Sequence, residues 1–303
     1  RADGLPDLGD AAQLELTPAM EKRIGEQAMR ELRADPAWLG DAEVNAYLNR
    51  LGSRLAAHIE GQGQSFELFA LRDPTLNAFA MVGGYLGVHT GLILAAESES
   101  ELASVLAHEI SHITQHHQAR MMSKAGQGQI ATLASLAVAI LAARSNPDVA
   151  MGAAVAGQAA SIQNQLNYSR DFEREADRVG LGLLDRAGFD VRGMASFFGR
   201  LQKYSQLYDN NAPSYLRTHP LTTERLADIA NRIQDKPYKQ VPDSLEFQFV
   251  RAKLRAMDGD ARDAIIYFKT QLKEHTYAGS EAAVHYGLSR AYLRAGDLAN
   301  AES

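Results

Sequence analysis

The chain has 303 residues, a formal net charge of −6 at pH 7 and no cysteine. This length suggests two domains, and the acidic balance gives no reason to expect a nucleic-acid partner. Without cysteine, disulfides and thiolate metal sites are excluded, so any metal must be held by His, Asp or Glu.

The N-terminal part predicts helices followed by a small sheet. Thr17-Pro18 opens one helix, and the apolar spacing of residues 41–58 predicts a second. Three strands are predicted at 65–71, 77–82 and 85–89. Gly83-Gly84, between the last two, is a hairpin signal. We therefore expect a mainly helical α+β fold with a small antiparallel sheet.

A further helix is predicted to begin after Ser98. Ser98 and Glu101 fit a capping box, in which each side chain accepts a hydrogen bond from a backbone N–H near the helix start. Apolar residues then recur at helical spacing, at Leu102, Val105, Leu106, Ile110 and Ile113. Neither Pro nor Gly occurs between Ser98 and Lys124. We therefore expect the helix to continue through His116 and His117.

A metal-binding motif lies within this helix. His108, Glu109 and His112 form the pattern His-Glu-x-x-His. Residues i and i+4 of a helix are about 400° apart, so the two histidines share one face and could hold one ion. Glu109 could reach a water molecule at the metal without ligating the metal itself. Zinc peptidases have this arrangement, and the alternative is a helix with two surface histidines.

A catalytic zinc site needs a third protein ligand. The best candidate is Glu173, which shares one face of a predicted helix with Asp177. Asp177 could accept a hydrogen bond from the second ring nitrogen of a ligand histidine. The alternative is a solvated helix with charges paired at i,i+4 spacing. His116 and His117 are expected to lie too far along the first helix to join the same ion.

Two runs of small and apolar residues lie between these helices, from Ile130 to Ala143 and from Val149 to Ile162. Each is shorter than the roughly 20 residues of a membrane span. We expect a tightly packed helical hairpin. The alternatives are a segment that touches a membrane and a lid over the site.

The composition changes after a predicted linker at 237–242. Gly259-Asp260 and Gly296-Asp297 recur about 37 residues apart, and Ala264 and Phe268 form an Ala-x-x-x-Phe pair. This pattern resembles tetratricopeptide (TPR) repeats. We expect a metallopeptidase domain at 1–240 and the start of a TPR-like helical domain at 241–303. About three repeats are needed to bury a core, so we expect the natural chain to continue past Ser303.

The motif at His108–His112, followed by the Glu-x-x-x-Asp pattern of Glu173 and Asp177, resembles the zinc metallopeptidases related to HtpX and the CAAX prenyl endopeptidases. Three shorter stretches are also similar to this family, namely Asn77-Ala78-Phe79-Ala80, Gly83-Gly84-Tyr85 and Thr90-Gly91-Leu92. The start at Leu5–Gly9 and the repeats resemble its periplasmic members. The resemblance implies a gluzincin-like domain with one Zn²⁺ per chain.

The resemblance also implies roles for individual residues. His108, His112 and Glu173 would ligate zinc, and Glu109 would be the catalytic residue. Thr218-His219-Pro220-Leu221 matches a pattern of the periplasmic members, which implies that His219 can occupy the fourth zinc position. It would then displace the attacking water and hold the enzyme inactive. The alternative is that His219 caps the helix predicted at 222–235.

For function, the resemblance implies an endopeptidase of the Gram-negative periplasm, with its signal peptide removed. It would degrade misfolded or stalled outer-membrane proteins and meet the barrel assembly machinery through its repeats. Its partners would be unfolded proteins and peptides, and no nucleic acid is expected. The resemblance also leaves room for peripheral association with a membrane. The competing hypothesis is a chaperone or assembly factor that binds unfolded outer-membrane proteins through the repeats and keeps a latent zinc site. The short apolar runs argue against a membrane-embedded peptidase.

Overall fold

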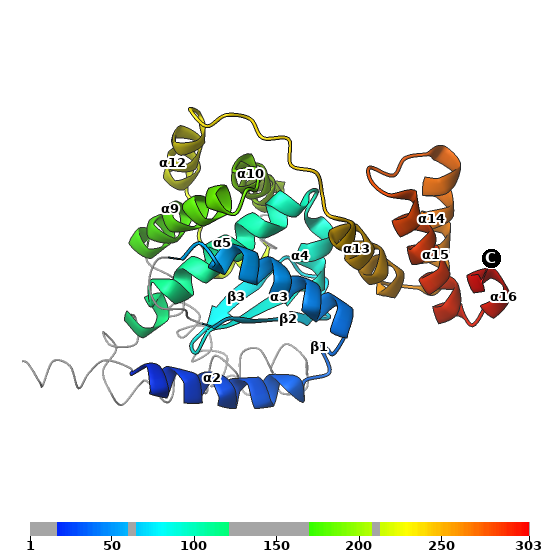
Figure 1. Cartoon of the computed structure of the whole chain (residues 1–303), viewed down its shortest axis with the longest axis horizontal. Helices are drawn as coiled ribbons and strands as arrows, with labels where there is room; N and C mark the ends of the chain where they lie inside the picture. The colour runs from blue at the N-terminus through cyan, green and yellow to red at the C-terminus, as the bar shows by residue number, and fades with distance from the viewer. Residues whose placement is uncertain (1–16, 60–64, 121–169, 208–212, 303) are drawn as a thin grey trace, which may run out of the picture.

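A four-stranded sheet lies within the N-terminal part of the molecule (Figure 1). The computed structural model describes residues 17–59, 65–120, 170–207 and 213–302. The strands are β1 (Trp38–Leu39), β2 (Glu67–Leu71), β3 (Ala78–Met81) and β4 (Tyr85–His89). Their order across the sheet is β1-β2-β4-β3, so β3 is an edge strand.

The expectation of an antiparallel sheet is wrong for one pair of strands. β3 and β4 form the hairpin predicted at Gly83-Gly84, where both glycines have positive φ. β1 and β2 are also antiparallel. β4, however, runs parallel to β2. The chain crosses from β2 to the far edge to form β3 and then turns back, so β4 enters between them in the direction of β2.

Helices make up most of the remaining described structure, and several begin at a side-chain cap. Side-chain oxygens of Thr17, Asp41 and Ser98 each accept a backbone N–H in the first turn that follows. Only the Ser98 half of the predicted capping box forms, because Glu101 accepts from the N–H of Glu97 instead. The N-terminal helices are α2 (Pro18–Arg33), α3 (Ala42–Ala56), α4 (Thr90–Ala95), α5 (Glu99–Thr114), α9 (Arg170–Arg186), α10 (Arg192–Leu207), α11 (Ser214–Thr218) and α12 (Thr223–Ile233). The mainly helical α+β prediction is confirmed.

The two faces of the sheet pack against different helices. Successive residues of a strand point to opposite faces. Leu68 and Leu86 belong to the large core cluster that includes α3 and α5, whereas Phe69 and Leu71 pack with Met29 of α2. Figure 1 shows α2 and the α3–α5 layer on opposite sides of the strands. The motif helix α5 therefore lies inside the fold, in the helical layer that covers one face of the sheet.

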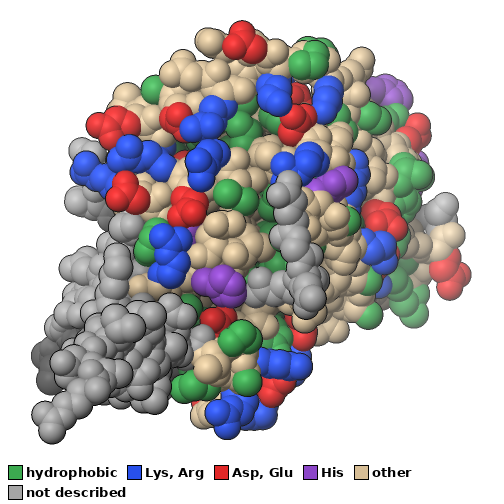
Figure 2. Space-filling view, turned by 60° about the vertical axis from the view of Figure 1, so that its left-hand side comes forward, with side chains coloured by type: hydrophobic (Ala, Val, Ile, Leu, Met, Phe, Trp, Pro, Cys, Tyr) green, Lys and Arg blue, Asp and Glu red, His purple; other side chains and the backbone are tan. Residues whose placement is uncertain are grey.

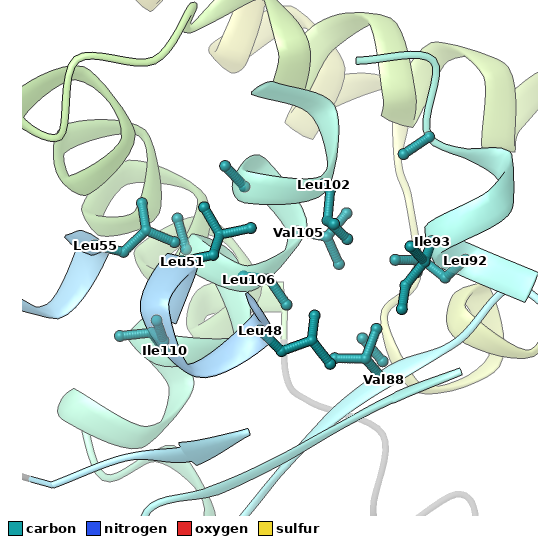
Figure 3. Packing of buried hydrophobic residues seen from close by; sticks show 14 of the residues in the cluster. Leu48, Leu51, Leu55, Val88, Leu92, Ile93, Leu102, Val105, Leu106 and Ile110 are labelled. Carbon is teal, nitrogen blue, oxygen red and sulfur yellow. The ribbon is translucent and has the colours of Figure 1, made fainter. Parts of the chain in front are cut away.

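Apolar side chains from three helices and the sheet hold α5 in place (Figure 3). They are Leu48, Leu51 and Leu55 of α3, Val88 of β4, Leu92 and Ile93 of α4, and Leu102, Val105, Leu106 and Ile110 of α5. Burying one such side chain contributes about 1.5–3 kcal/mol. Every residue from Glu99 to Ile113 is buried, so the motif is carried by a rigid core helix.

The motif helix is shorter than predicted. α5 ends at Thr114, and His116 has a φ of 51°, in the left-handed region. Helical structure resumes only at His117. The expectation of one continuous helix through His116 and His117 is therefore wrong. A left-handed residue interrupts a right-handed helix and redirects the chain.

α9 crosses α5 at the motif, and a glycine allows their backbones to meet. A Cβ atom at Gly180 would lie 3.1 Å from the carbonyl of Ala107 and from Cα of His108. Asp177 and Glu173 precede Gly180 by roughly one and two helical turns, on the same face. The close approach at Gly180 therefore brings both carboxylates next to α5.

The C-terminal region consists of α13 (Leu245–Met257), α14 (Ala261–Glu274), α15 (Glu281–Ala295) and α16 (Leu298–Glu302). Gly259 and Gly296 both have positive φ in the turns that follow α13 and α15. Phe268 of α14 is buried against Gly287 of α15 in a second, smaller core. α13 contributes to both cores, through Phe247 on one face and Ala252 on the other. It therefore joins α14 and α15 to the N-terminal region.

Charges of both signs are interspersed over the face shown in Figure 2. No helix among the described residues is long and apolar enough to cross a membrane. The apolar runs at Ile130–Ala143 and Val149–Ile162 lie outside the described residues, as does the start at Leu5–Gly9.

Candidate metal centre

The four predicted ligand side chains meet at one buried point. His108 and His112 come from α5, Glu173 comes from α9, and His219 caps the C-terminal end of α11. Each is at most 1% exposed, and their ligand atoms lie within 4.8 Å of one another. Three elements that are distant in sequence thus converge on one small polar centre inside the core.

The donor set and its spacing fit a zinc ion. Nε2 of His108 is 3.0 Å from Nε2 of His112, and the oxygens of Glu173 are 3.5 and 3.3 Å from these two nitrogens. A tetrahedral zinc ion with bonds of about 2.0–2.1 Å holds its ligand atoms roughly 3.3 Å apart. Oε1 of Glu173 accepts no hydrogen bond from any described residue, which is unusual for a buried carboxylate. A cation between these atoms would satisfy it.

A buried ion-pair network supports the ligands from behind. Oδ1 of Asp177 lies 3.0 Å from Nδ1 of His108, the ring nitrogen that faces away from the cluster. Arg225 of α12 donates from Nε and Nη2 to Asp177, both at 2.7 Å, and its Nη1 lies 2.7 Å from Oε2 of Glu173. Arg225 is 2% exposed. One guanidinium therefore faces two buried carboxylates.

The pKa values of the two motif histidines are shifted in opposite directions. Burial lowers the pKa of His108, but hydrogen bonds to Asp177 and Glu173 outweigh it and raise this pKa to about 9. Burial lowers the pKa of His112 to about 4, against the opposing effect of Glu173. A metal ion must displace the proton on His108 in order to bind, so metal affinity should weaken as the pH falls.

Glu109 lies beside the ligand cluster. Its Oε2 accepts a hydrogen bond of 3.1 Å from the N–H of Ala80, in edge strand β3. Its Oε1 is 3.5 Å from Nε2 of His219. Burial raises the pKa of Glu109 to about 8, although the positive charge of His108 opposes the rise. A carboxylate with such a pKa is suited to accept and return a proton near neutral pH.

The ring of His219 lies next to the rings of both motif histidines. Its ring centroid lies 5.4 Å from that of His108 and 5.2 Å from that of His112. The ring stacks on Tyr215 of α11, with 4.4 Å between centroids. The alternative role of His219 as the cap of the following helix is wrong, because the side chain of Thr222 caps α12.

Arg225 and Tyr215 are buried parts of the site that the sequence patterns did not indicate, and His117 contacts the ligand His112 without joining the ligand set. Burial and the nearby charge of Glu109 raise the pKa of Tyr215, so its hydroxyl stays protonated. Nδ1 of His117 lies 2.8 Å from Nδ1 of His112, although a straight helix would have separated the two. Arg225 lies in an ordinary amphipathic helix and carries no local signal of its contacts.

Comparisons with known proteins agree with this geometry. The family model for peptidase family M48 matches residues 42–233. The beta-barrel assembly-enhancing protease of Escherichia coli K12 is 34% identical over 264 residues, which are 87% of this chain and 54% of that protein. A Vibrio cholerae relative is 39% identical over 290 residues, which are 95% of this chain and 60% of that protein.

More distant relatives include metalloprotease LoiP of Escherichia coli K12, which is 27% identical over 72% of this chain and 82% of that protein. The chain spans 54% of the length of the Escherichia coli protease and 60% of the length of the Vibrio cholerae relative. M48 peptidases are zinc-dependent, and the buried cluster supplies suitable ligands. With the family model covering more than half of its residues, the chain belongs to peptidase family M48.

Proposed function

We propose that this protein is a zinc-dependent endopeptidase in which His108, His112 and Glu173 hold the metal. The observation that carries the proposal is the convergence of three buried ligands with Glu109, a buried carboxylate outside the ligand set, next to an edge strand. A purely structural metal site does not need a carboxylate that can act as a general base. When bound, zinc would polarise the scissile carbonyl and lower the pKa of a water molecule.

The chain's own residues supply the remaining chemistry. Glu109 takes a proton from the attacking water and passes it to the leaving amine. Asp177 holds the ring of His108 in the orientation that directs Nε2 toward the metal. An extended peptide would pair with edge strand β3 in place of the contacts that Glu109 and Gln118 make with the backbone of Ala80 here. Such a peptide would be read by main-chain hydrogen bonds rather than by side-chain identity.

For substrates, we propose misfolded or stalled outer-membrane proteins in the periplasm of a Gram-negative bacterium. The support is the name beta-barrel assembly-enhancing protease carried by the Escherichia coli relative. Recognition through extended backbone also suits unfolded chains, since a folded protein rarely presents an extended segment to an edge strand. We further propose that α13–α16 begin a TPR-type domain through which the protein meets the barrel assembly machinery.

The function is tested by metal removal. Purified protein is incubated with a urea-denatured outer-membrane barrel protein, with the folded form of the same barrel as control. We expect cleavage of the unfolded form, its loss after treatment with a zinc chelator, and its recovery when zinc is added back. Cleavage that continues in fully metal-free protein would refute the proposal.

We also propose that His219 regulates the site by taking the fourth zinc position. Its ring lies within reach of the same ion as the three ligands, where it would exclude the attacking water. If the blocked form holds about nine tenths of the molecules, His219→Ala should raise cleavage roughly tenfold. His285→Ala, at an exposed histidine of α15, is the matched control. Unchanged cleavage by His219→Ala argues against blocking, and reduced cleavage would suit a role in stabilising the oxyanion.

The second candidate function is chaperoning through the C-terminal helices, with cleavage secondary. It is supported by apolar side chains that α14–α16 leave exposed, including Ile266, Leu293 and Leu298. Such a surface could bind unfolded apolar segments. Both functions can belong to one chain, because the metal site and these helices have separate cores.

A further inference from the structure

A buried histidine that is not in the ligand set contacts His112 from behind. His117 has no exposed surface, and its Nδ1 lies 2.8 Å from Nδ1 of His112. In a continuous helix, residues i and i+5 point about 140° apart, so this contact could not form. The left-handed residue His116, with φ of 51°, makes it possible.

The far side of the His117 ring is also held. Its Nε2 lies 3.0 Å from Oε2 of Glu175, which also accepts a hydrogen bond of 3.1 Å from Arg120. The ring stacks on Phe172 of α9, with 4.5 Å between centroids and 13° between planes. His117 is thus clamped between the end of the motif helix and the start of the helix that carries Glu173.

The order of these contacts determines which nitrogens carry protons. His112 must direct the Nε2 lone pair at a metal, so its Nδ1 carries the hydrogen. The N–H at Nδ1 of His112 can donate to Nδ1 of His117 only when Nδ1 of His117 carries no proton. The proton of a neutral His117 is then on Nε2, where it donates to the carboxylate of Glu175.

We propose that His117 and Glu175 are positioning residues that orient His112 and fix its tautomer for zinc, an inference that rests on the zinc site of the proposed function. The two ligand histidines would then be supported differently. His108 has a carboxylate directly behind it, with 3.0 Å between its Nδ1 and Asp177. His112 reaches a carboxylate only through a second imidazole. Partners of this kind typically change metal affinity by about 10–100-fold.

Two substitutions separate hydrogen bonding from packing. His117→Phe keeps a planar ring that can stack on Phe172 but has no acceptor for His112. His117→Asn loses the stacking but keeps an oxygen near the position of Nδ1. Zinc affinity is measured for each by competition with a chromogenic chelator, with His285→Phe as a control at an exposed histidine. Melting in the presence of chelator shows whether each variant folds.

We expect zinc affinity to fall by about 10–100-fold in His117→Phe and by less in His117→Asn. A role in packing alone predicts the reverse order, with His117→Phe close to wild type, and would overturn the proposal. If the wild-type protein binds no zinc, the proposed function fails instead, so the two failures are distinguishable.

A measurement on the unmodified protein keeps the test independent of how variants fold. Long-range ¹H–¹⁵N correlation spectra distinguish the two neutral tautomers of histidine. In the zinc-loaded protein we expect the proton on Nδ1 of His112 and on Nε2 of His117. A proton on Nδ1 of His117, or a doubly protonated ring, would contradict the assigned direction of the hydrogen bonds.

Discussion

Glu109→Gln is expected to bind zinc like the wild type and to cleave unfolded substrate about 10²–10⁴-fold more slowly. Glutamine has nearly the same shape, and its amide oxygen can still accept the hydrogen bond from the N–H of Ala80. It cannot, however, accept a proton from water. Zinc content is measured on the same samples as cleavage, which separates loss of the base from loss of the metal.

Cleavage at the wild-type rate by zinc-loaded Glu109→Gln would rule out Glu109 as the base. The same variant separates the two candidate functions in cells that lack the natural protein. Failure to restore barrel assembly indicates that cleavage is needed. Full complementation by this variant would show that assembly depends on binding rather than on hydrolysis.

The second large effect is expected at Arg225. Its guanidinium contacts Asp177 and Glu173, and all three side chains are at most 2% exposed. Arg225→Leu removes the guanidinium that two buried carboxylates share and leaves them only His108 as a cation among the described residues, so we expect the free energy of unfolding to fall by about 3–5 kcal/mol. A loss of this size is a large fraction of the 5–15 kcal/mol typical of a folded domain. Denaturant unfolding of metal-free protein measures it.

Two controls make the Arg225 result interpretable. Arg232 forms an exposed i,i+4 pair with Asp228 on the same helix, so Arg232→Leu should cost less than about 1 kcal/mol. Arg225→Lys keeps the charge but cannot form the bidentate contact with Asp177, so we expect an intermediate loss in the free energy of unfolding. Bound zinc partly replaces the missing charge beside Glu173, so the deficit should shrink in zinc-loaded protein. Equal losses for Arg225→Leu and Arg232→Leu would contradict this account.

Local sequence patterns predicted the elements whose causes are local. Helical spacing placed His108 and His112 on one face. The predicted helix starts at Thr17-Pro18, at residue 41 and after Ser98 agree with α2, α3 and α5 within a residue. The Gly83-Gly84 hairpin was predicted for the same reason, since both glycines adopt a positive φ that other residues rarely take. The end of α5 was missed, because a left-handed histidine at His116 has no sequence signal comparable to glycine.

Long-range pairing was harder to predict. The parallel pairing of β2 with β4 arises because β4 returns between β2 and β3. The sequences of the strands are compatible with either parallel or antiparallel pairing. The role of Gly180 likewise appears only when α9 lies against the backbone of Ala107. These features depend on how packed elements choose their neighbours, which periodicity along one chain does not encode.

By itself, the sequence determined the motif helix, the pairing of Glu173 with Asp177 on one helical face, and the exclusion of thiolate ligands. Only the tertiary structure decided that Arg225 faces both carboxylates and that His117 stands behind His112. The physical reason is that side chains on one helix face are set by the 3.6-residue turn. Contacts between helices are set instead by the packing of the whole core, which brings distant residues to within hydrogen-bonding distance.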